Sequence, residues 1–182
     1  MSSHYRTHGK IETPLTDADW VGVMRRGHFA RREHMGFVAI LYYSAVRKSE
    51  ALRTTKNQLD IKGDRLYYSV GTRLKRGKNT PPLPLPLEAP FVDEIIWCRD
   101  QVEPYERVWN FSKKTAYNIV SRILPGYPHY FRLSRITNFF LAGWTIAQVR
   151  SWTGLSLRAL EYYVGLVDIT KMGDSLNGIP RP

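Results

Sequence analysis

His129 and Arg132 lie three residues apart, and the tyrosine pair Tyr162-Tyr163 follows about thirty residues later. Residues at this spacing share one face of a helix, so a helix that begins near His129 presents an imidazole and a guanidinium together. Two cations that face a phenol suit chemistry at a phosphodiester, because the cations hold the non-bridging oxygens while the phenolate attacks phosphorus. His-x-x-Arg alone is a weak signal, and its weight depends on the rest of the chain.

Arg47 and Lys75 fit the same chemistry. Arg47 follows an apolar segment and precedes Glu50 by three residues, and Lys75 lies in a basic turn between two alternating segments. Two arginines can clamp the phosphate oxygens bidentately, a lysine can protonate the leaving oxygen, and a tyrosine can hold the phosphate covalently. Plainer interpretations remain: an exposed Arg47–Glu50 ion pair, a solvated turn, and tyrosines that only pack in the core.

The charge balance indicates a polyanionic partner. The chain has 182 residues, and its 27 lysines and arginines exceed its 16 acidic residues by eleven. We expect double-stranded DNA as the partner. The single cysteine and the lack of His-x-His or clustered acidic motifs predict no metal and no cofactor. The longest apolar run is too short to cross a bilayer, so we expect a soluble cytoplasmic protein without a membrane partner.

The hydrophobic pattern predicts an α+β fold that is mainly α, with a small three-stranded antiparallel sheet. Thr16 and Asp19 have the spacing of a capping box at the start of the first helix. We expect Ile146 and Val149 to face inward on one short helix, and Leu157, Leu160 and Val164 to form the inner face of the last helix. Helices are expected over about 16–26, 30–44, 88–99, 112–124, 129–141, 145–151 and 157–166, and strands within 58–87.

The ordered set of motifs resembles the catalytic domain of the tyrosine recombinase, or phage-type integrase, family. The first segment, residues 42–52, is similar to the box around the family's first arginine. Lys75-x-x-Lys78 followed by Pro84-Leu85 is similar to the hairpin that carries the family's catalytic lysine, and His129-x-x-Arg132 to its second box. Gly143-Trp144-Thr145-Ile146 and Trp152-Thr153-Gly154 are similar to the approach to its third box, and Tyr163 follows at the position of the nucleophile. The resemblance covers about residues 14–167, with a basic arm at 1–13 and a tail at 168–182. Residues 111–117 are similar to archaeal and archaeal-virus members.

The resemblance implies a site-specific recombinase or integrase that cuts and rejoins DNA strands through a 3′-phosphotyrosine intermediate. Family members act as tetramers assembled on DNA, so we expect a monomer in its absence and a nucleoid-associated protein in a prokaryotic or virus-infected cell. The implied catalytic residues are Arg47, Lys75, His129, Arg132 and Tyr163. The expected DNA contacts are Lys78, Lys113, Lys114, Arg122 and Arg135.

The chain departs from the family pattern at three points. Leu155 stands where the family usually has histidine or tryptophan, and leucine cannot donate a hydrogen bond to phosphate. The step from there to the tyrosine is one residue short, so Tyr162 remains a rival to Tyr163. The family's amino-terminal DNA-clamping domain has no counterpart, which fits an excised domain or a minimal member. Two alternatives stay open: DNA relaxation of the type IB topoisomerase kind, and a recombinase-derived DNA-binding protein with weakened catalysis.

Overall fold

The computed structural model describes residues 14–70, 81–123, 129–165 and 167. This part of the chain is mainly helical with one three-stranded antiparallel sheet, as the sequence predicted. The helices are α1 (Asp17–Arg26), α2 (Arg32–Ser44), α3 (Lys48–Ala51), η1 (Lys56–Gln58), α4 (Val92–Asp100), α5 (Lys113–Ile123), α6 (His129–Leu141) and α7 (Ile146–Thr153), and residues 157–165 and 167 are also helical. The strands are β1 (Leu59–Lys62), β2 (Arg65–Tyr68) and β3 (Leu83–Pro86).

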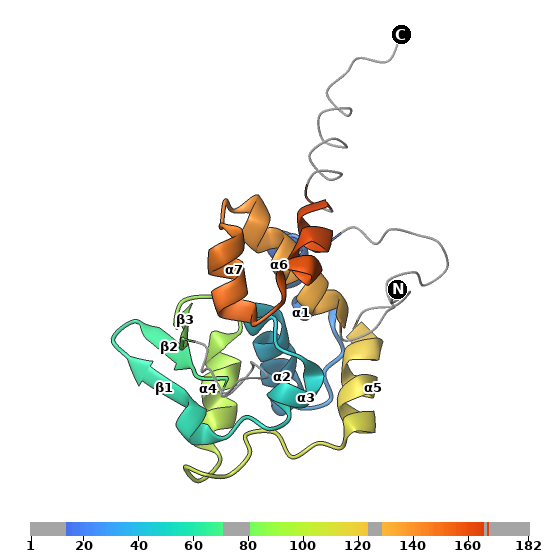
Figure 1. Ribbon diagram of the computed structural model, residues 1–182. Helices are drawn as coiled ribbons and strands as arrows, with labels where there is room; N and C mark the ends of the chain where they lie inside the picture. Colours follow the sequence, from blue (N-terminus) through green and yellow to red (C-terminus); the bar gives the residue numbers. More distant parts are fainter. Residues whose placement is uncertain (1–13, 71–80, 124–128, 166, 168–182) are drawn as a thin grey trace.

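Helix α2 is the centre of the fold (Figure 1). Its residues from Gly36 to Ser44 are all buried, as expected for a helix that is apolar nearly all round. It packs most extensively on α4, where Gly36 allows the two backbones to approach closely. A Cβ atom on Gly36 would lie 2.6 Å from the carbonyl oxygen of Glu94 and 2.7 Å from Sγ of Cys98. The contact therefore requires glycine at this position.

The sheet lies beside α4, with strand order β1-β2-β3 (Figure 1). Strands β1 and β2 pair from Leu59 opposite Tyr68, and β2 and β3 pair through Leu66 opposite Leu85. The prolines of the third strand are tolerated because β3 is at the edge, where Pro84 faces Tyr67. One face of the sheet is apolar and closes the main core.

A second, smaller core lies between α6, α7 and the last helix. Its buried members are Ala45, Leu133, Ile136, Phe139, Val149, Leu160 and Tyr163. The predicted inner faces of the last two helices were wrong in part, because Ile146 and Leu157 are exposed. The last helix buries Leu160, as predicted, together with Tyr163 and Val167, and these three follow one another at helical spacing. Ala45 at the end of α2 connects this core to the central helix.

Candidate functional site

Arg132 is buried at the meeting point of three helices. It lies on α6 with only 2% of its surface exposed. Its Nη1 donates a hydrogen bond to the carbonyl oxygen of Ala45, and its Nη2 donates to the carbonyl oxygen of Thr153 at 3.4 Å. These two carbonyls belong to the carboxyl ends of α2 and α7, where helix carbonyls lack partners within the helix. The guanidinium therefore joins α6 to the ends of α2 and α7.

Arg47 follows Ala45 by two residues and precedes the short helix α3. Glu50 holds it twice: one carboxylate oxygen accepts from the Arg47 backbone N–H at 2.6 Å, and the other lies 3.0 Å from Nη1. The Arg47 side chain is nevertheless 51% exposed. The Arg47–Glu50 pair expected from the i, i+3 spacing is present. The Ala45 carbonyl that accepts from Arg132 and the backbone of Arg47 lie within the same three-residue junction, residues 45–47.

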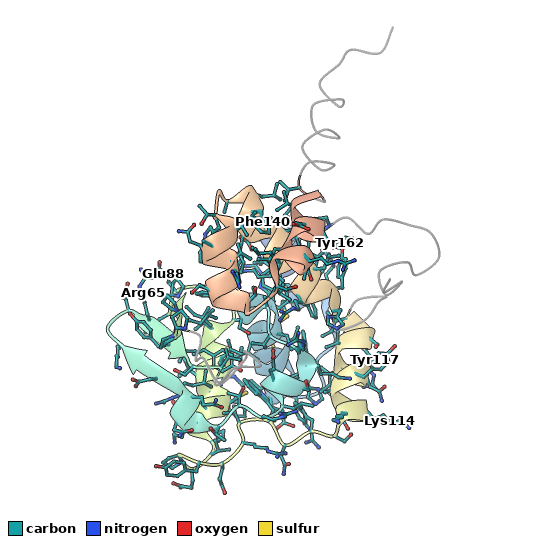
Figure 2. The ribbon with its side chains drawn as sticks, in the orientation of Figure 1. Arg65, Glu88, Lys114, Tyr117, Phe140 and Tyr162 are labelled. Carbon is teal, nitrogen blue, oxygen red and sulfur yellow. The ribbon has the colours of Figure 1, made fainter. Side chains whose placement is uncertain are left out.

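The two candidate tyrosines differ in burial. Tyr163 is 3% exposed and belongs to the second core with Ala45, whereas Tyr162 is 43% exposed. Their rings meet edge to face at 5.6 Å between centroids. Figure 2 shows Tyr162 on the outer side of the last helix. Tyr163 is thus the tyrosine that packs in the same core as Ala45, whereas Tyr162 is largely exposed.

His129 is the first residue of α6 and is exposed, one turn before Arg132. The expected general acid Lys75 and the neighbouring Lys78 fall within residues 71–80, outside the described part of the chain, as do the segments 1–13 and 168–182. Their roles stay predictions. The structure brings together the junction of Arg47, the Arg132 guanidinium and the core that holds Tyr163.

Leu155 lies just after the turn that ends α7. Gly154 makes this turn with φ of +64°, and the Leu155 backbone N–H donates to Oγ1 of Thr153 at 3.3 Å. The Leu155 side chain packs partly buried against the second core. It contributes apolar packing where the resembled family usually places a hydrogen-bond donor.

A basic surface extends from α3 to α5. Lys113, Lys114 and Arg122 are exposed on α5 as expected, and Figure 2 shows Lys114 at the edge of the molecule. Lys48, which the sequence interpretation did not single out, donates from Nζ to the carbonyl oxygen of Lys113 at 3.2 Å. Its ammonium also lies 5.3 Å from the ring centroid of Tyr117, which is exposed. Lys48 thereby connects the helix that follows Arg47 to the basic face of α5.

Arg135 lies apart from this basic surface, and its side chain is turned toward α1. Its Nη1 is 2.9 Å from a carboxylate oxygen of Asp17 on α1, and its side chain is only 19% exposed. The guanidinium carbon also lies 5.4 Å from the ring centroid of Tyr42 and 4.8 Å from that of Phe139. The guanidinium is turned toward α1 and α2 because an acidic group and aromatic faces surround it there.

Arg135 also borders an open groove of about 430 Å³, formed by α1, the sheet, α6 and α7. Its walls include the aromatic side chains of Trp20, Tyr43, Trp144 and Trp152. None of the expected catalytic residues of the described part lines it. Within the described ranges, no group of three or more histidine, cysteine or acidic side chains is placed to hold a metal ion, and no helix is long and apolar enough to span a membrane.

Comparison with solved structures identifies recombinases with the same fold. No protein-family model and no curated protein sequence matches the chain. Among solved structures, the XerH site-specific recombinase bound to difH substrate in a pre-cleavage complex has a TM-score of 0.69 at 14% identity, over 85% of this chain and 51% of that one. Its post-cleavage complex on a palindromic substrate gives 0.71 at 14% identity, over 91% and 53%.

The XerA recombinase gives a TM-score of 0.67 at 15% identity, over all of this chain and 67% of that one. The chain thus spans about half to two thirds of the length of the proteins that it matches. At such low identity the likeness shows the fold alone. The described chain has the fold of a tyrosine recombinase catalytic domain.

Proposed function

We propose that this protein is a site-specific DNA recombinase or integrase that cuts and rejoins DNA strands through a phosphodiester to Tyr163. One observation carries the proposal: the Arg132 guanidinium donates to the Ala45 carbonyl oxygen, Arg47 follows Ala45 by two residues, and Ala45 belongs to the core that includes Tyr163. The fold is that of recombinases whose solved complexes are described as bound to DNA before and after cleavage. The basic surface on α5 supplies the positive charge that a DNA partner needs.

In the proposed reaction, the phenol oxygen of Tyr163 attacks the phosphorus atom of one strand. A new bond forms between phosphorus and the phenol oxygen, and the bond to the 5′-oxygen breaks. His129 assists in moving the phenol proton, and Lys75 protonates the leaving 5′-oxygen. Rejoining is the reverse transfer, in which a 5′-hydroxyl attacks the phosphotyrosine and the phenol leaves.

Arg47 and Arg132 would stabilise the charge that builds on the non-bridging oxygens in the transition state. The exposed Arg47 guanidinium is open to solvent and can meet a phosphate, while its Glu50 partner fixes the backbone that carries it. Arg132 is pre-positioned by backbone carbonyls, so little reorganisation is needed to hold its charge in place. Because arginine offers parallel N–H donors, it matches a phosphate better than lysine does.

Lys78, Lys113, Lys114 and Arg122 are proposed to contact the DNA backbone, which positions a duplex without reading its sequence. Assembly on DNA would follow the tetramers of the resembled family, with a monomer in the absence of DNA. No metal or other cofactor takes part in the proposed reaction.

A second candidate is a recombinase-derived DNA-binding protein with weakened catalysis. The observation that favours it is Leu155, whose packed aliphatic side chain gives the phosphate no hydrogen bond at a position where the resembled family usually has one. Both proposed functions are consistent with the observed fold and with the basic surface on α5. They differ only in whether a covalent adduct with DNA accumulates.

The test uses the full chain and a pool of nicked duplexes with randomised sequence, because the target site is unknown. A nick near the cleavage point releases a short fragment and traps the covalent adduct, which denaturing electrophoresis detects. We expect adduct with the wild-type protein and with Tyr162→Phe, and none with Tyr163→Phe. Adduct that survives Tyr163→Phe contradicts the assigned nucleophile. Binding without adduct supports the second candidate, and supercoil relaxation without strand exchange indicates a topoisomerase.

A further inference from the structure

Arg135 lies one turn beyond Arg132 on α6, but it takes part in a separate network. Its guanidinium contacts Asp17 at the start of α1 and lies over the rings of Tyr42, Tyr43 and Phe139. The hydroxyl of Tyr42 donates to the same Asp17 oxygen at 2.6 Å. Asp17 thus accepts from α2 and α6 at once, at the point where α1 begins.

Two neighbours of Arg135 on α6 bind the same short segment. Oγ of Ser134 accepts from the Leu15 backbone N–H at 3.0 Å, and the Asn138 amide donates to the Leu15 carbonyl oxygen at 2.7 Å and to the Tyr42 hydroxyl at 3.3 Å. Ser134, Arg135 and Asn138 therefore fasten one side of α6 to residues 15–17. We call these contacts, together with the aromatic rings under Arg135, the α1–α6 clamp.

Arg132 also lies on α6, but its guanidinium donates hydrogen bonds to the carbonyl oxygens of Ala45 and Thr153, which lie outside the α1–α6 clamp. An α-helix is stiff over one or two turns, so contacts at residues 134–138 fix the rotation and the axial position of residues 129–132. A displacement of about 1 Å at a positioned group is enough to lower a reaction rate about a hundredfold. The clamp is thus suited to set where His129 and Arg132 stand.

We propose that Arg135 is a positioning residue that holds the first turn of α6, with His129 and Arg132, in its reactive place through the α1–α6 clamp. That this restraint matters for catalysis rests on the proposed function. That Arg135 restrains the start of α6 rests on the contacts alone. It replaces the expectation that Arg135 contacts DNA.

The aromatic contacts outweigh the ion pair in this clamp. The Asp17 side chain is 71% exposed, so solvent screens its attraction to Arg135, and such pairs contribute little. The guanidinium itself is mostly buried against three rings, where cation–π contacts are stronger than at open surfaces. We therefore expect removal of Arg135 to matter more than removal of the Asp17 charge. Lysine at position 135 should rescue only in part, because an ammonium cannot stack as a planar guanidinium does.

Hydrogen exchange of the full chain without DNA tests whether Arg135 restrains the start of α6. The variants are Arg135→Met, Arg135→Lys and Asp17→Asn, with Arg150→Met on the exposed face of α7 as the matched control. We expect amides 133–135, the first in α6 with acceptors inside the helix, to exchange at least about tenfold faster in Arg135→Met, less so in Asp17→Asn and Arg135→Lys, and unchanged in the control. Unchanged protection of these amides in Arg135→Met overturns the proposal. If Arg135→Met does not fold, Arg135→Lys and Asp17→Asn decide by the same criterion.

Whether this restraint affects the reaction is tested by the single-turnover rate of adduct formation at saturating DNA. A positioning role predicts that Arg135→Met lowers the adduct rate constant about tenfold or more while DNA affinity and its salt dependence stay at wild-type values. A phosphate contact predicts the reverse: weaker binding and a salt slope reduced by about 1, as expected for Lys114→Gln. That result overturns the proposal. If even the wild-type protein forms no adduct, the proposed function fails while the exchange experiment still decides the role of Arg135.

Discussion

The guanidinium of Arg132 donates a hydrogen bond to the carbonyl oxygen of Ala45, across 87 residues of sequence. This contact joins the helix with the His-x-x-Arg motif to the end of the central helix, two residues before Arg47. Ala45 adopts a left-handed conformation with φ of +49°, which is uncommon for a residue with a Cβ atom. The conformation of this junction therefore depends on a long-range hydrogen bond from Arg132 and on the left-handed backbone of Ala45.

Replacing Arg132 by methionine should destabilise the fold. The change leaves the Ala45 and Thr153 carbonyls without the donors that they have now, and an unsatisfied buried acceptor costs about 1–3 kcal/mol. Chemical denaturation should show a loss of this size in the free energy of unfolding. Arg47→Met is the matched control: its side chain is half exposed, so we expect less than about 1 kcal/mol. Equal losses in the two variants would contradict a structural role for Arg132.

The backbone at Ala45 should accept glycine but reject a branched side chain. Ala45→Gly relieves the left-handed conformation, worth about 1 kcal/mol, and loses one buried methyl group, worth about 0.8 kcal/mol. These terms offset each other, so we expect a small net change in the free energy of unfolding. Ala45→Val combines a β-branched residue at positive φ with overpacking, and should cost about 2–4 kcal/mol. A tolerated valine would show that the junction can adopt another conformation.

The close approach of α2 and α4 predicts a steric effect at Gly36. Gly36→Ala places a methyl group against the backbone carbonyl of Glu94, which cannot move without shifting α4, and should cost about 1–3 kcal/mol. Gly22→Ala on α1 is the control. Its Cβ would meet only the mobile end of the Arg26 side chain, and alanine favours a helix by up to about 1 kcal/mol. Thermal unfolding should therefore shift in opposite directions for the two variants.

His34 should make stability depend on pH. Burial of its ring lowers the pKa of His34 below the usual value, and the guanidinium groups of Arg31 and Arg122 act in the same direction, against Glu33. In the unfolded chain the pKa is higher, so between the two values the unfolded state binds more protons. Stability is then full above the unfolded pKa of about 6.5 and falls as pH drops toward the folded pKa.

The measurement is the free energy of unfolding at pH 8 and at several values below 6.5, for the wild-type protein and for His34→Gln. Glutamine does not titrate, so the decrease across this window should be smaller in the variant. An identical decrease would assign the effect to other groups. Phe111, whose ring meets His34 edge to face at 5.4 Å, is left unchanged in both proteins.

Local signals were sufficient for most of the fold. The Thr16–Asp19 capping box and the Arg47–Glu50 pair are confirmed, because both depend on residues three positions apart in one helix turn. The three strands were predicted from alternation and turn residues, and the edge position of the third from its prolines. Short-range chemistry decides each of these features, so the sequence carries them directly.

The environments of the site residues could not be predicted in the same way. The burial of Arg132 depends on Ala45 and Thr153, and that of Arg135 on Asp17, a residue 118 positions earlier. Such contacts arise from the packing of whole helices and leave no periodic trace. The same limit explains Ile146 and Leu157: a short helix has too few apolar residues to define which side meets the core.

Cys98 offers a practical advantage for experiments on this chain. It is the only cysteine in the sequence, it is buried between α2 and α4, and burial raises the pKa of its thiol to about 12. Thiol-reactive dyes attack the thiolate, so at neutral pH the native cysteine should remain unlabelled while the protein is folded. A cysteine introduced on the surface, such as Arg150→Cys, can then carry a single fluorophore without removal of Cys98. Dye uptake by the unaltered chain would in turn report its unfolding.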